Sequence, residues 1–201
     1  MGDVKLWLRD LEEAWKKENE CTHVEVTQAD AYMTWDFDVA APRQTVWEHF
    51  TVPGQRQKWW PTEAIIENSS NRRRGIGTEI HCMHGKDAIV EEVLDWRPFD
   101  YFTVSALLPV PGAPKIMLTH AFQDRTNDAT HIEMRVAKPK PKDQAFVDQA
   151  VAKFKENITE AIGNLRLMVE DQPTSLSVID EPPMIASSER FLNEPVKSSA
   201  S

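Results

Sequence analysis

A long amphipathic helix, predicted over residues 143–171, constrains the fold more than any other feature of this sequence. At 1.5 Å per residue, a helix of that length spans roughly 43 Å. One of its faces is apolar without interruption, and such a face needs a surface to cover it. A helix of this length can cross the whole face of a sheet. The apolar residues recur at three- and four-residue steps: Val147, Val151, Phe154, Ile158, Ala161, Ile162, Leu165 and Val169.

The segments before this helix have the period of two that is typical of half-buried strands. The clearest is residues 33–39, in which apolar and polar side chains alternate. Pro42 then suits the first turn of a short helix, and a second short helix is predicted over residues 55–60. Further strand segments are residues 64–66, 78–84, 88–96, 101–108, 116–122 and 130–137. Their short, even spacing predicts an antiparallel meander, so the predicted fold class is α+β.

The chain divides into three expected parts. Residues 1–31 form an N-terminal segment with an amphipathic helix over 3–20, residues 32–171 form the domain, and residues 172–201 form a tail rich in Pro and Ser. The N-terminal helix carries two tryptophans on one narrow stripe, which something must cover. We expect it to dock on its own domain; a homodimer or partner contact, or a junction cut from a longer chain, is the alternative. The tail is expected to be extended or disordered.

The charge balance excludes several classes of partner. The chain has 23 Lys and Arg against 32 Asp and Glu, a formal net charge of -9. This argues against nucleic acid, which needs a basic patch, and against an anionic membrane surface. No apolar run approaches the ~20 residues of a membrane span. Two cysteines, Cys21 and Cys82, cannot build a disulfide framework, and they suggest a reducing, cytoplasmic location.

The order of elements resembles the START-like, or SRPBCC, superfamily, which includes polyketide cyclase-like proteins. The resemblance covers residues 33–171. It is carried by Asp38-Val39-Ala40-Ala41-Pro42 before Val46-Trp47, by Trp59-Trp60-Pro61, by Gly75-Ile76-Gly77-Thr78, by the meander, and by a last helix ending Asn164-Leu165-Arg166. It implies a helix-grip fold, in which a curved antiparallel sheet wraps around the long helix. It also implies a cavity between them for an apolar or amphipathic small molecule, with no cofactor.

Two segments add a second resemblance. Residues 81–85 and 91–99 are similar to stretches in START-like domains attached to class III nucleotide cyclases. No cyclase domain fits within this chain. The resemblance therefore implies a regulatory or accessory domain.

Three titratable residues are candidates for acid–base chemistry: His84, His120 and Glu92. Each shares a strand face with apolar residues, so all three would meet in one cavity if these faces lie inward. Burial would move their pKa values toward neutrality. The alternative, which we favour, is that they orient a ligand or satisfy one another. We expect no metal site, because His81 and His84 point to opposite faces, and Cys82 with His84 gives only two ligands.

The predicted cavity is mostly apolar, which favours binding over catalysis. Its predicted lining is Trp35, Phe37, Trp59, Trp60, Cys82, Phe102, Leu118, Phe122, Met134, Phe154 and Ile158. Three functions stay open. The first is a sensor or carrier that binds an apolar or amphipathic molecule. The second is a cofactor-independent enzyme of the polyketide cyclase or dehydratase kind. The third is a protein-interaction module that uses the N-terminal helix and the tail.

Overall fold

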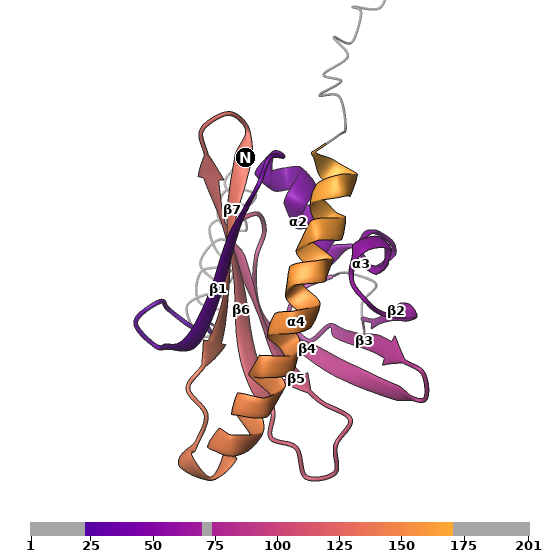
Figure 1. Cartoon of the computed structure of the whole chain (residues 1–201), viewed down its shortest axis with the longest axis vertical. Coiled ribbons are helices and arrows are strands. Elements are labelled where there is room, and N and C mark those ends of the chain that lie inside the picture. Colours follow the sequence, from indigo (N-terminus) through magenta and orange to yellow (C-terminus); the bar gives the residue numbers. More distant parts are fainter. Residues whose placement is uncertain (1–22, 70–73, 171–201) are drawn as a thin grey trace, which may run out of the picture.

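The computed structural model describes residues 23–69 and 74–170. One curved antiparallel sheet holds seven strands in the order β1-β7-β6-β5-β4-β3-β2 (Figure 1). The strands are β1 Ala31–Val39, β2 Ala64–Asn68, β3 Glu79–His84, β4 Asp87–Arg97, β5 Tyr101–Leu107, β6 Ile116–Arg125 and β7 Ala129–Ala137. The helices are α2 Arg43–Thr51, α3 Pro53–Trp59 and α4 Gln144–Val169. The predicted meander and the two short helices after the first strand are confirmed.

The long helix α4 lies across the inner face of the sheet, so the predicted α+β helix-grip fold is confirmed (Figure 1). The predicted apolar stripe is buried along the helix, except at Phe154, which is half-buried and packs against the core. The helix begins at Gln144, one residue later than predicted. A 3-10 turn, Pro141–Asp143, precedes it.

The two short helices close one end of the inner face. Helix α2 contacts β6, β7 and α4, and α3 contacts β2 and α4. Helix α2 buries Val46, Trp47 and Phe50, and α3 buries Arg56 and Trp59. Aromatic rings therefore fill this part of the sheet's inner face, and any cavity must lie further along α4.

A bulge in β4 changes which residues face inward along that strand. Val93 pairs with Val104 of β5, yet the next pair is Asp95 with Thr103, which leaves Leu94 unpaired. Before the bulge, Glu91 and Val93 are buried on the inner face. After the bulge the even-numbered residues face inward, because the extra residue shifts the alternation of side chains by one position. Asp95 therefore faces the outer side of the sheet.

Residues 23–26 pack on the outer face of the sheet. The Val24 amide donates to the Asp95 carboxylate at 2.8 Å, and the Val26 amide donates to Thr119 Oγ1 at 2.8 Å. The Val26 side chain is fully buried there. This segment thus packs on the domain that the sequence predicts over residues 32–171.

Several predictions fall outside the described residues. These are the amphipathic helix over 3–20 with its homodimer or partner contact, and the tail over 172–201. Among the described helices, none is long and apolar enough to span a bilayer.

Candidate functional site

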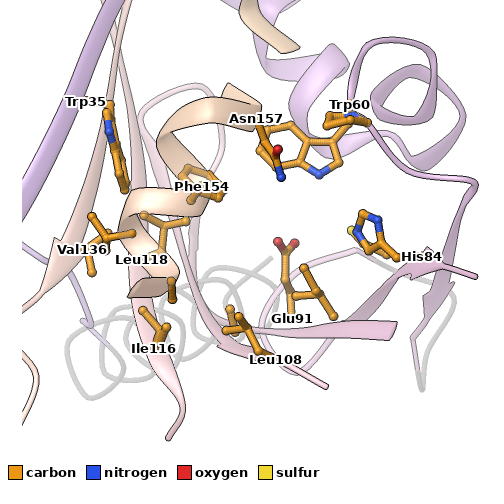
Figure 2. Close-up of a pocket in the computed structure, with 16 residues that line it drawn as sticks. Trp35, Trp60, His84, Glu91, Leu108, Ile116, Leu118, Val136, Phe154 and Asn157 are labelled. Carbon is orange, nitrogen blue, oxygen red and sulfur yellow. The ribbon is translucent and has the colours of Figure 1, made fainter. Parts of the chain in front are cut away.

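A cavity of about 120 Å³ lies between α4 and the inner face of the sheet, and it opens partly to solvent (Figure 2). Its walls come from β1, β3, β4, β5, β6, β7 and α4, together with Trp60 and Pro61 after α3. Most of the lining is apolar. Five residues of the predicted lining do line it: Trp35, Trp60, Cys82, Leu118 and Phe154.

Six residues of the predicted lining do not border the cavity: Phe37, Trp59, Phe102, Phe122, Met134 and Ile158. All six are buried in the core or packed against it. For Phe102 and Phe122, the reason is the aromatic cluster under α2. The Trp47 ring lies 5.6 Å from the ring of Phe102 and 5.3 Å from that of Phe122, between ring centroids, so these positions are filled by protein.

The two adjacent tryptophans at the end of α3 have different surroundings. Trp59 is fully buried, and its indole N–H donates to the His49 carbonyl at 2.9 Å. Trp60 borders the cavity, where its ring lies 5.6 Å from the Phe154 ring. The Phe154 ring lies 5.0 Å from Trp35 on its other side. Trp35, Phe154 and Trp60 therefore form a continuous aromatic wall, the surface on which a planar ring packs well.

The polar centre of the site is an ion pair that the sequence pattern does not predict. Arg56 Nη1 and Nη2 donate to the two Glu91 carboxylate oxygens at 2.6 and 2.9 Å, and both side chains are buried. The Arg56 guanidinium also lies over the Trp60 ring, 5.1 Å from its centroid. Glu91 lines the cavity, whereas Arg56 does not. The cavity thus meets the carboxylate, with the guanidinium bonded to it from outside the lining.

Both members of the pair stay charged. Burial alone would lower the pKa of Arg56, but the neighbouring Glu91 carboxylate raises it above its usual value. Burial alone would raise the pKa of Glu91, but the Arg56 charge and its hydrogen bonds hold the pKa of this carboxyl below its usual range. Glu91 is therefore an ionised acceptor with low basicity.

The expectation that Glu92 faces the cavity is wrong. Glu92 points away from the cavity lining and forms an ion pair with Lys115 at 3.1 Å, with 42% of its side chain exposed. The two faces of β4 carry the same kinds of residue in the same order. One face has Ile89, Glu91 and Val93, and the other has Val90, Glu92 and Leu94. The period of two therefore gives no signal for which set faces inward.

The structure does not bring the two candidate histidines to one place. His84 lines the cavity, and its Nε2 is buried without a hydrogen-bond partner. His120 is on the inner face, but it lies in the core rather than in the cavity lining. It stacks on Phe102 with 4.4 Å between ring centroids, and its Nδ1 is also buried without a partner. The proposed acid–base set of His84, His120 and Glu92 is thus not assembled.

The burial of His120 predicts a pH-dependent stability. Burial, and then the positive charge of Arg56, lower the pKa of His120 to about 3. An unfolded histidine titrates near 6.5, so between these values the unfolded chain binds the extra proton. The contribution of neutral, buried His120 to stability is fully present above about pH 6.5 and is lost as the pH falls. From pH 7 to pH 5 this residue should lower the free energy of unfolding by about 2 kcal/mol.

Urea unfolding of the parent and of His120→Leu at both pH values measures this effect. The difference between pH 7 and pH 5 should be smaller in the variant by about that 2 kcal/mol, whatever its stability at pH 7. An unchanged difference would mean that His120 is not held neutral by the fold.

The Cys82 thiol, which also lines the cavity, is not an activated nucleophile. Burial raises the pKa of the Cys82 thiol to about 11, so it stays protonated at neutral pH. Within residues 23–69 and 74–170, no group of three or more His, Cys, Asp and Glu side chains is placed to hold a metal ion.

Comparison with known proteins gives the family. The chain belongs to the family described as polyketide cyclase/dehydrase and lipid transport, whose model matches residues 22–170. The predicted SRPBCC membership is confirmed, and the likeness to nucleotide cyclase-associated domains stays a prediction. No curated protein matches the sequence at a significant level.

Solved structures share the fold at low sequence identity. Ms6760 from Mycobacterium smegmatis is 16% identical with a TM-score of 0.56, over 76% of this chain and 98% of that one. XoxI from Bacillus cereus is 16% identical with a TM-score of 0.53, over 70% and 96%. CalU16 from Micromonospora echinospora is 17% identical with a TM-score of 0.52, over 77% and 75%. At these identities the likeness shows the fold alone.

Proposed function

We propose that this domain binds a small, largely apolar molecule in the cavity between α4 and the sheet. The observation that carries the proposal is the distribution of polarity in that cavity. Its walls are mainly aliphatic and aromatic, and its polar groups are few, with Glu91, His84 and Asn157 among them. An apolar pocket with a few polar groups that fix orientation is the usual form of a small-molecule site.

The surroundings of these polar groups favour binding over catalysis. The low pKa of Glu91 makes it a weak base, and its two oxygens already accept hydrogen bonds from Arg56. His120 is outside the cavity lining, and the Cys82 thiol stays protonated. A general base is efficient when its pKa lies near the working pH. These surroundings therefore support a role as carrier or sensor more than a cyclase or dehydratase activity.

Two finer points belong to the proposal. We place the domain in the cytoplasm, which is supported by the cysteine content and by the buried free thiol of Cys82. The protein-interaction alternative depends on residues 1–22 and 171–201, and no contact of the described residues supports it.

Filling the cavity tests the proposal. Ala150 of α4 borders the cavity, whereas Ala152 of the same helix is exposed. Ala150→Trp should weaken binding of the uncharged fluorescent probe N-phenyl-1-naphthylamine at least tenfold, because the indole takes the space that the probe needs. The matched Ala152→Trp variant should bind it like the parent, and thermal unfolding checks that both variants fold. Equal probe binding by two folded variants would place the site elsewhere.

Native mass spectrometry of the parent would show whether a small molecule copurifies.

A further inference from the structure

We infer that the cavity selects an uncharged ring compound that carries a hydroxyl group, with Glu91 as the acceptor of its hydrogen bond and Arg56 as the residue that positions Glu91. This inference rests on the proposed function and names the chemical class of its ligand. It follows from the charges around the cavity, from the open hydrogen-bonding positions, and from the size and walls of the cavity.

The charges around the cavity disfavour anionic ligands. Among the described residues that line the cavity, Glu91 is the one with a formal charge, and none is a lysine or an arginine. The Arg56 guanidinium is already bonded to both oxygens of Glu91. A ligand carboxylate would therefore lie against the Glu91 carboxylate without a cation of its own, and like charges repel strongly in a poorly hydrated site. The cavity should reject carboxylates.

The charges around the cavity also disfavour cationic ligands. An aromatic wall beside a carboxylate is a common way to bind an ammonium group. Here Arg56 already neutralises Glu91 and lies over the ring of Trp60. A second cation would lose its hydration and gain no unpaired anion in return. The cavity should reject ammonium groups as well.

The open hydrogen-bonding positions favour neutral donors. Each Glu91 oxygen accepts one hydrogen bond from Arg56, and a carboxylate oxygen has a second lone pair. His84 Nε2 is buried without a partner. Figure 2 shows Glu91 and His84 bordering the same space below Trp60. A ligand hydroxyl that donates its proton to a Glu91 oxygen keeps two lone pairs, with which it accepts a hydrogen bond from the His84 Nε2–H. This arrangement satisfies groups that are otherwise expensive to bury.

The size and walls of the cavity indicate a ring. A cavity of about 150 Å³ takes a benzene molecule in another protein. This one measures about 120 Å³ and opens partly to solvent, so a fused-ring ligand would place its second ring toward the opening. The wall formed by Trp35, Phe154 and Trp60 offers aromatic faces and edges to a planar ring.

Four naphthalenes of similar shape test the inference: 2-naphthol, 2-methylnaphthalene, 2-naphthoate and 2-naphthylmethylammonium. Each displaces bound N-phenyl-1-naphthylamine from the full chain at pH 7, and the apparent Kd values are compared. 2-Naphthol should bind at least tenfold more tightly than either charged compound, and several-fold more tightly than 2-methylnaphthalene. Equal or tighter binding of 2-naphthoate or of the ammonium compound would overturn the inference. Displacement by 2-methylnaphthalene in the same experiment would leave the proposed function standing.

Variants then assign the selectivity to the ion pair. Glu91→Gln leaves the Arg56 charge beside the cavity and should reverse the order of 2-naphthoate and 2-naphthol, whereas the neighbouring Glu92→Gln should keep the parent order. If Glu91→Gln does not fold, the double variant Arg56→Met with Glu91→Leu replaces it. This variant should bind 2-naphthol and 2-methylnaphthalene within about twofold of each other. A parent-like preference for 2-naphthol in the double variant would show that the hydroxyl does not bond to Glu91.

Discussion

Replacement of Glu91 by leucine should lower the free energy of unfolding by about 3–5 kcal/mol, because it leaves a buried guanidinium without its partner. Arg56 is 4% exposed and Glu91 6% exposed, so solvent compensates neither charge. The two short, parallel hydrogen bonds also hold α3 to the middle of β4. Urea unfolding monitored by far-UV circular dichroism measures the loss.

Two controls separate the lost ion pair from a general effect of the mutation. In the double variant Arg56→Met with Glu91→Leu, both charges are replaced by apolar side chains, and most of the lost stability should return. In Glu92→Leu, the same substitution one residue along removes only an exposed pair with Lys115, and the change should stay within about 1 kcal/mol. A loss in Glu91→Leu as small as that in Glu92→Leu would contradict the buried ion pair.

Replacement of Trp47 by alanine should also lower the free energy of unfolding by about 3–5 kcal/mol, the usual range when a large aromatic side chain is removed from a core. The Trp47 ring is buried and lies within 6 Å of four other rings, those of Trp96, Phe99, Phe102 and Phe122. These contacts join α2 to the inner face of the sheet. Thermal and urea unfolding measure the effect.

The matched variant is Trp60→Ala, which removes the same side chain at the edge of the cavity. Trp60 is half-buried and borders the cavity, so its removal should affect probe binding more than stability. Trp47→Ala should show the opposite pattern at a temperature where it remains folded. Equal losses of stability in the two variants would contradict a core that depends on the ring contacts of Trp47.

The sequence pattern predicted the fold well because the fold depends on long-range periodicity. The apolar stripe of α4 repeats over the whole helix, and the strands before it alternate clearly, as in residues 33–39. The requirement that this stripe be covered leaves few arrangements other than a sheet wrapped around it. The start of α4 was predicted to within one residue, since Pro141 separates it from β7, and its end at Val169 was predicted to within two.

The site was harder to predict, because it depends on which of two equivalent faces turns inward. The odd- and even-numbered residues of β4 have the same pattern of polarity. The bulge at Leu94 also exchanges the inward and outward positions further along the strand. Glu92 was therefore predicted to face the cavity, whereas Glu91 does. Arg56 was missed because its partner lies 35 residues away in the sequence, and nothing local to α3 indicates it.

The extent of the cavity depends on packing that no local pattern contains. Phe102 and Phe122 were predicted to line it, and both do lie on the inner face of the sheet. The side chains of α2 cover that part of the face, as the contact of Phe50 with Phe122 at 5.2 Å between ring centroids shows. Whether an inward residue meets a ligand or another side chain depends on where α2 docks.

The most direct test of ligand binding in this cavity is a titration of ¹⁵N-labelled protein with N-phenyl-1-naphthylamine, followed through the indole N–H signals of the tryptophans. Trp35 and Trp60 border the cavity, whereas Trp47 and Trp59 are buried away from it. If the ligand binds between α4 and the sheet, ring currents from the probe should shift the signals of Trp35 and Trp60 strongly and those of Trp47 and Trp59 little. Saturable binding that leaves Trp35 and Trp60 unchanged would contradict the account.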